Sequence, residues 1–150
     1  MEEPTILVAL DTAVQSELAM LIARGYSYRG ITAVDGGSLV GPYLEAQLEN
    51  RNNQRTILVE YFPRSEKAPE NLALVVKRFR HESVNLRAFL EYTQAGASIE
   101  TIQLSHYVGS SAERIRSCLS AMRAVLESGA QTLLSGQEWP SIPFNWQGLK

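Results

Sequence analysis

The densest set of charged side chains in the chain is the basic run Lys77-Arg78-Phe79-Arg80. Strand alternation would place Arg78 and Arg80 on one face, with Lys77 and Phe79 on the other. Arginine forms charge-assisted, often bidentate, hydrogen bonds with carboxylates, and Arg87 on a following helix can turn toward the same patch. The run therefore predicts a partner-binding patch, Arg78, Arg80 and Arg87, for an acidic protein surface. The competing interpretation is a solvated strand end.

Residues that could hold a metal or act as nucleophile and base are few. His81 and His106 lie 25 residues apart, and neither has a Cys, His or Asp neighbour at ligand spacing. The single cysteine, Cys118, falls in the middle of a predicted helix, whereas a reactive thiolate favours a helix N-terminus with a basic partner. Asp35 belongs to the turn signal Asp35-Gly36-Gly37. We therefore expect no catalytic, cofactor-binding or metal-binding residues, and we expect Cys118 to be buried and unreactive.

The strands that must carry the basic run are predicted from period-2 hydrophobicity. Residues 43–49 and 55–62 alternate between apolar and polar side chains, and the polar stretch 50–54 joins them as an antiparallel hairpin. Further strands are predicted over residues 26–34 and 72–79, and the second of these is apolar on both faces, so we expect it to be central or covered. Residues 38–40 are expected to be extended after a tight turn. Gly41-Pro42 is expected to mark a bulge or an edge.

Helices are predicted at both ends of the chain. Apolar residues recur at three- and four-residue spacing over 4–24, and Gly25 follows as a stop signal. A helix is expected to begin at the N-cap Asn85 and to end at Gly96, and a weaker helical stretch covers 98–107. The capping box Ser110-Ser111-Ala112-Glu113 opens a third helix. Residues 137–150 contain two tryptophans and two prolines, so we expect an irregular tail packed on the body.

These elements predict one α+β domain over residues 1–150. Its antiparallel β-meander has about four strands, flanked by an N-terminal helix and two to three C-terminal helices. Hydrophobic residues make up 45% of the chain and charged residues 20%, which is typical of a globular protein. The net charge of −2 gives no general attraction to nucleic acid or to an anionic membrane. With one cysteine and no apolar run of about 20 residues, a cytoplasmic location is expected.

Several short segments resemble one group of small bacterial proteins. The segments are Arg24-Gly25-Tyr26, Leu44-Glu45-Ala46, Ile57-Leu58-Val59-Glu60-Tyr61, Val84-Asn85-Leu86-Arg87-Ala88-Phe89-Leu90, and Leu133-Leu134-Ser135-Gly136 followed by Trp139. In this order the chain resembles the immunity proteins encoded beside bacterial polymorphic toxins, and related uncharacterised single-domain proteins. The resemblance implies a helix-and-sheet domain that neutralises a toxin by binding it, without catalysis. It assigns no functional residue.

The sequence is compatible with two functions that belong to different classes. The first is a non-enzymatic, protein-binding module of the bacterial cytosol, which the uneven charge supports: residues 1–50 hold two basic and seven acidic groups, and the basic groups follow later. The alternative is a small-molecule-binding protein or an enzyme whose site is assembled from scattered Arg, Tyr and Glu, such as Arg78, Tyr61 and Glu45. A flat charged face would favour the first function and a deep pocket lined by those residue types the second.

Overall fold

The computed structural model of the 150-residue chain describes residues 2–66, 68–78, 82–92, 96–128 and 131–134. The helices are α1 (Glu2–Glu17), α2 (Ala19–Ala23), α3 (Gly37–Val40), α4 (Leu86–Tyr92), α5 (Gly96–Thr101), α6 (Ser111–Ser128) and α7 (Gln131–Leu134), with a 3₁₀ turn at Leu104–His106. The strands are β1 (Ser27–Asp35), β2 (Pro42–Asn50), β3 (Arg55–Phe62), β4 (Asn71–Arg78) and β5 (Glu82–Asn85). The predicted α+β class is confirmed. The predicted tail, residues 137–150, lies outside the described residues.

The five strands form one antiparallel meander in the order β1-β2-β3-β4-β5. Every strand pairs with its neighbour in sequence, because each connection is short enough to return the chain antiparallel. The prediction of about four strands missed β5, a four-residue strand at the edge of the sheet that contains a single buried apolar residue, Val84. A strand this short carries too little alternation to be recognised.

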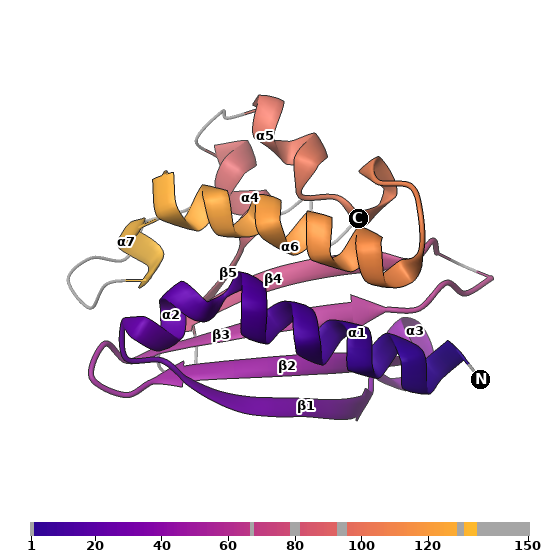
Figure 1. Ribbon diagram of the computed structural model, residues 1–150, viewed down its shortest axis with the longest axis horizontal. Helices are drawn as coiled ribbons and strands as arrows, with labels where there is room; N and C mark the ends of the chain where they lie inside the picture. The colour runs from indigo at the N-terminus through magenta and orange to yellow at the C-terminus, as the bar shows by residue number, and fades with distance from the viewer. Residues whose placement is uncertain (1, 67, 79–81, 93–95, 129–130, 135–150) are drawn as a thin grey trace.

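The helices cover one face of the sheet, which we call the covered face. Figure 1 shows α1 and α6 side by side on this side of the sheet. The buried residues of β2, β3 and β4 alternate strictly, so that one side chain in two enters the core. Fully buried leucines and other large side chains from helices and strands meet there: Leu10, Leu18, Leu21, Leu48, Ile57, Leu74, Leu86, Leu104, Ile115, Leu119, Met122 and Leu126.

The hairpin of β2 and β3 has the predicted register-setting turn. Asn50 pairs with Arg55, and the residues between them form the turn, in which Gln54 has a φ of 56°. The Asn50 side chain accepts a hydrogen bond from the backbone N–H of Asn53 at 3.1 Å. This side-chain-to-backbone bond is the usual reason for asparagine at such a position.

The connection between β1 and β2 differs from its prediction. Residues 38–40 were expected to be extended after a tight turn, but they belong to α3, a single helical turn. Asp35 Oδ1 accepts the N–H of Gly37 at 3.1 Å, and the N–H of Gly41 donates to the Gly37 carbonyl at 2.9 Å. Gly36 closes the loop onto the Gly41 carbonyl, which would lie 2.4 Å from a Cβ at Gly36. Glycine is therefore needed at position 36 because the backbone approaches closely there, and not because the loop is a two-residue hairpin turn.

Two helix boundaries also differ from the predictions. The predicted helix over 4–24 is broken at Leu18, between α1 and α2. Gly96 was expected to end the helix after Asn85, but α4 ends at Tyr92 and Gly96 begins α5. The predicted starts are confirmed: the Asn85 side chain accepts the N–H of Arg87 at 2.8 Å, and Ser110 forms the capping box with Glu113. Gly41-Pro42 is not a bulge, because β2 simply begins at Pro42.

A buried arginine anchors the C-terminal helix to the sheet. Arg55 is 2% exposed; its Nε donates to the Leu133 carbonyl at 2.8 Å and its Nη1 to the Asn53 carbonyl at 3.1 Å. Tyr26 donates to the neighbouring Leu134 carbonyl at 3.0 Å. Burial raises the pKa of Tyr26 to about 12, although the nearby Arg55 charge acts in the opposite direction. The carbonyls that end α7 are therefore satisfied by side chains from β3 and from the residue before β1.

Among the described helices, none combines the length and the apolar character that a membrane span requires.

Candidate functional site

The second face of the sheet, which we call the open face, carries the half-buried residues that alternate with the buried ones along each strand. Its central row joins Thr32, Glu45, Glu60 and Ala73 across four strands. These side chains are half-buried or exposed, in contrast to the fully buried rows of the covered face. The open face therefore presents side chains that keep part of their surface in contact with solvent.

Two carboxylates meet at the centre of the open face. Glu45 of β2 and Glu60 of β3 are direct register partners, which places their Cβ atoms about 5 Å apart. Burial raises the pKa of Glu60, and the charge of Glu45 raises it further, while Lys77 opposes both. Neither carboxylate makes a hydrogen bond or an ion pair with another described residue. Like charges directly opposite each other destabilise a sheet, so this pair costs stability at neutral pH.

Apolar side chains flank the carboxylate pair on both sides. Tyr43 and Phe62 stack with ring centroids 4.8 Å apart and an interplanar angle of 33°. On the opposite side, Leu58 pairs with Val75 across β3 and β4. An aromatic pair and two aliphatic residues around a charged centre have the composition of a small binding surface.

Glu49, at one end of the open face, is already paired with two arginines. Glu49 accepts a hydrogen bond from Arg29 at 2.9 Å and lies 3.6 Å from the Nε of Arg51. Hydrogen bonding to Arg29 is the main reason that the pKa of Glu49 is lowered. Glu45 and Glu60 differ from Glu49 because they make no ion pair with another described residue, and Lys77 on the same face acts on Glu60 without an ion-pair contact.

The residues predicted as a basic partner patch lie elsewhere. Arg78 is on the covered face at the end of β4, where its guanidinium hydrogen-bonds the carboxylate of Glu82 across the β4–β5 hairpin. Arg87 is exposed on α4, with its Nε 3.7 Å from Glu91. Arg80 lies outside the described residues. Arg78 and Arg87 thus have different carboxylate partners, and their contact with another protein stays a prediction.

The alternative set of Arg78, Tyr61 and Glu45 is not brought together. Tyr61 is on the covered face at one end of β3, and Arg78 pairs with Arg55 at the other end. Glu45 projects from the opposite face of the sheet. A different Arg, Tyr and Glu cluster does form: Tyr61 donates to Glu70, and Arg114 donates to the same carboxylate at 2.7 Å. The sequence gives no spacing signal for this cluster, because its members come from three distant segments.

The histidines and the cysteine offer no assembled centre among the described residues. Cys118 is completely buried, its thiol donates to the Ile102 carbonyl at 3.3 Å, and burial raises its pKa to about 12. The prediction that Cys118 is buried is confirmed. His106 is exposed in the 3₁₀ turn, and His81 is outside the described residues. Within the described ranges, no three His, Cys, Asp or Glu residues lie together as metal ligands would.

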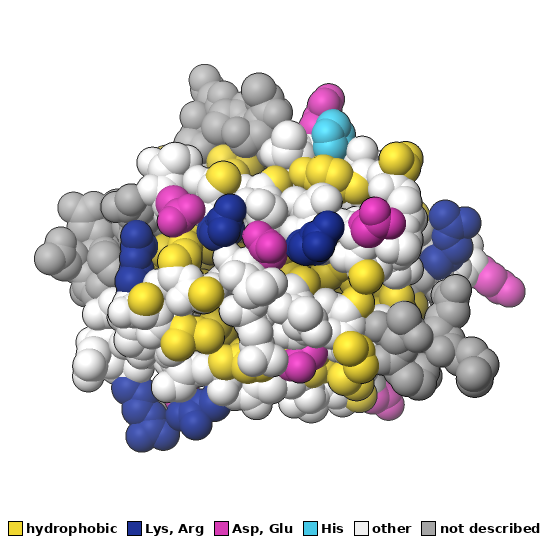
Figure 2. Space-filling model, in the orientation of Figure 1, with side chains coloured by type: hydrophobic (Ala, Val, Ile, Leu, Met, Phe, Trp, Pro, Cys, Tyr) yellow, Lys and Arg dark blue, Asp and Glu magenta, His cyan; other side chains and the backbone are white. Residues whose placement is uncertain are grey.

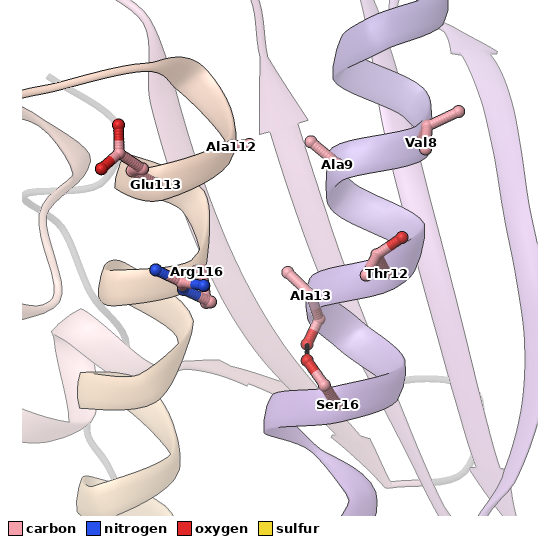
Figure 3. A pocket seen from close by; sticks show the side chains of 8 residues that line it. All are labelled: Val8, Ala9, Thr12, Ala13, Ser16, Ala112, Glu113 and Arg116. Atoms are coloured by element: carbon pink, nitrogen blue, oxygen red, sulfur yellow. Dashed lines mark hydrogen bonds between the residues drawn. The ribbon is translucent and has the colours of Figure 1, made fainter.

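The helical side of the molecule has a balanced charge and a shallow groove. Figure 2 shows dark blue and magenta side chains interspersed along α6, where Arg123 lies 3.7 Å from Glu17 and 3.8 Å from Glu127. Figure 3 shows the groove between α1 and α6, with Ala9 and Ala13 on the side of α1 that faces α6. Most of the exposed wall of the groove is apolar, and the polar residues Thr12, Ser16, Glu113 and Arg116 also line it.

Comparisons of the chain with protein-family models, with curated proteins and with solved structures find no match.

Proposed function

We propose that this protein acts by binding another protein through the open face of its sheet, in the manner of an immunity protein that neutralises a toxin. The observation that carries the proposal is the Glu45–Glu60 pair, two adjacent carboxylates that make no hydrogen bond or ion pair with another described residue, although the charge of Lys77 acts on Glu60 from the same face. A fold gains nothing from this arrangement, whereas a partner that supplies a cation removes the repulsion on binding. The proposed setting is the bacterial cytoplasm.

The chemistry of the open face selects a basic partner. An arginine guanidinium can donate hydrogen bonds to both carboxylates, and Tyr43 and Phe62 provide aromatic surface next to it. Leu58 and Val75 supply apolar contact on the other side of the same row. A buried anchor surrounded by apolar contacts is the usual anatomy of an energetic centre in protein interfaces. This partner has the opposite charge to the one that the Arg78, Arg80 and Arg87 prediction would require.

The experiment uses the product of the adjacent gene as the partner. The two proteins are co-expressed in a bacterial host, growth is recorded, and the dissociation constant is measured by calorimetry. We expect the wild-type chain to bind and to protect growth. The double variant Glu45→Lys/Glu60→Lys should bind at least about a hundredfold more weakly, because two attractive contacts become repulsive.

A matched double variant controls for the change in net charge. Glu66 and Glu100 are exposed residues that lie outside the sheet, so Glu66→Lys/Glu100→Lys changes the total charge by the same amount. We expect this control to bind like the wild type. A Glu45→Lys/Glu60→Lys chain that is folded by circular dichroism and keeps its affinity contradicts the proposal, as does a wild-type chain that neither binds nor protects.

A further inference from the structure

A cavity of about 720 Å³ lies at the end of the sheet where α1 and α6 begin. Its walls come from the ends of β1, β2 and β3, the segment before β4, and the first turn of α6. The apolar part of the wall is formed by Ile6, Ala33, Pro42, Leu44 and Pro63. A volume of this size is within the range of about 300–1,000 Å³ that holds small-molecule ligands.

One corner of this cavity is polar and is held in place by hydrogen bonds. Glu70 accepts from the hydroxyl of Tyr61 and from Nη1 of Arg114, the second at 2.7 Å. Arg114 Nη2 also donates to Ser111 Oγ at 3.4 Å. The Arg114 and Glu70 side chains are 20% and 17% exposed, so the pair is well shielded from water. A ligand would therefore meet a preformed polar corner.

The charged side chains that line this corner are Glu70, Arg114 and Arg64, so positive charges outnumber negative ones by one. Burial works to raise the pKa of Glu70, but the hydrogen bonds from Arg114 and Tyr61, with the charges of Arg114 and Arg64, outweigh it and lower the pKa. Glu70 is thus an anion at neutral pH, and its charge balances that of Arg114. Arg64 also lines the cavity, and its guanidinium makes no hydrogen bond or ion pair with another described residue. Its positive charge is available to a ligand.

We propose that this cavity binds a small organic monocarboxylate, with the carboxylate at Arg64 and the apolar body against Ile6, Pro42 and Leu44. A single excess positive charge matches a monoanion. A phosphate dianion would bring a second negative charge next to Glu70, so it fits less well. The arginine fork gives the carboxylate a bidentate partner, and the apolar wall gives the rest of the ligand a place to bury its surface.

The test compares two acids with a neutral analogue at neutral pH. The probes are 4-phenylbutyrate, octanoate and 4-phenylbutyramide, and binding to the full chain is measured by calorimetry and ligand-observed NMR. We expect at least one acid to bind, and we expect 4-phenylbutyramide to bind at least about tenfold more weakly than 4-phenylbutyrate. Two acids that both fail to bind at about 5 mM overturn the proposal.

Two variants place the binding in this cavity. Arg64→Gln should weaken acid binding about tenfold and leave amide binding unchanged, because only the charge interaction is lost. Ala33→Trp adds bulk at an exposed position of β1 that lines the cavity, and it should abolish binding of acid and amide alike. Arg116→Gln is the matched control, since Arg116 is exposed on α6 and lines the groove in Figure 3, not this cavity.

The binding results for these probes and variants test the carboxylate proposal independently of the proposed protein partner. Equal binding of acid and amide, or acid binding that survives both Arg64→Gln and Ala33→Trp, overturns it. Loss of acid binding in Arg116→Gln to the same degree as in Arg64→Gln also overturns it, because the effect would then follow net charge alone. All three variants leave Glu45 and Glu60 unchanged, so failure here and failure of the proposed function are separate results.

Discussion

The two faces of the sheet treat charged side chains in opposite ways. On the covered face, Arg55 donates to backbone carbonyls and Arg78 pairs with Glu82. On the open face, Glu45 and Glu60 lie opposite each other and make no ion pair with another described residue, and only the charge of Lys77 offsets part of their repulsion. Partnered charges hold the fold together, whereas the unpartnered pair lowers its stability. Such local destabilisation is characteristic of functional surfaces, and this contrast supports the proposal that a partner binds the open face.

The largest effect is expected on removing the buried charge of the covered face. Arg55→Met should lower the free energy of unfolding by roughly 3 kcal/mol, because it leaves buried carbonyls such as that of Leu133 without a donor. Urea unfolding at neutral pH measures the change. Arg51→Met, in the exposed turn next to it, should change stability by less than about 0.5 kcal/mol. Equal effects of the two substitutions would remove the contrast between the faces.

A smaller loss is expected at the polar corner. Glu70→Gln should cost roughly 1–2 kcal/mol at neutral pH, since it weakens the bonds from Tyr61 and Arg114. The pKa of Glu70 is lowered in the folded protein, so its contribution is present above the usual carboxyl pKa and is lost as the pH falls through the lowered value. The difference between wild type and variant should therefore shrink in acid. A difference that stays constant with pH would show that the charge plays no part.

A gain in stability is expected at the centre of the open face. Glu60→Gln should raise the free energy of unfolding by up to about 1 kcal/mol at neutral pH, because it removes a partly buried charge and its repulsion from Glu45. The pKa of Glu60 is raised in the folded protein, so ionisation destabilises the fold as the pH rises from the usual carboxyl pKa through the raised value. The gain should therefore vanish below that range.

The control for this gain lies on the same face. Glu49→Gln removes a carboxylate that Arg29 and Arg51 already neutralise, and it should be neutral or slightly destabilising. Thermal or urea unfolding over a pH series compares the two variants. If Glu60→Gln destabilises the protein at neutral pH, Glu60 has a stabilising partner and the account of the open face is wrong.

The smallest effect is expected at the buried thiol. Cys118 lies on the buried side of α6 with a pKa raised by burial to about 12, so a thiol reagent at neutral pH should label the native protein negligibly. In denaturant the same thiol should react quickly, which provides the internal control. Rapid labelling of the native chain would show that the core under the helices opens readily, and that the covered face is not closed as described.

Much of the fold could be predicted because local patterns agree with it. The alternation at 43–49 and 55–62 identified the central hairpin, and the capping box at Ser110 identified the start of α6. The error at residues 38–40 falls in a loop whose shape depends on backbone hydrogen bonds, not on side-chain periodicity. The helical turn α3 depends on close approach of Gly36 to the Gly41 carbonyl, which no local pattern signals.

The candidate site was harder to predict because it depends on register. Glu45 and Glu60 were visible as outward residues of two strands, and the hairpin register would have placed them opposite each other. The basic run at Arg78 predicted a partner-binding patch because its charges are dense along the chain. In the structure, Arg78 pairs with Glu82 across the next turn. The cavity cluster of Tyr61, Glu70 and Arg114 spans segments too distant in sequence for any spacing rule.

Methyl NMR of the complex with the product of the adjacent gene tests the central claim most directly. Leu58 and Val75 project from the open face, while Leu74 and Val76 of the same sheet are buried on the covered face, and Leu7 and Val8 are exposed on α1. We predict that the methyl signals of Leu58 and Val75 shift on binding and that those of the other four do not. Shifts confined to Leu7 and Val8, with Leu58 and Val75 unchanged, would place the partner on the helical side and contradict the account.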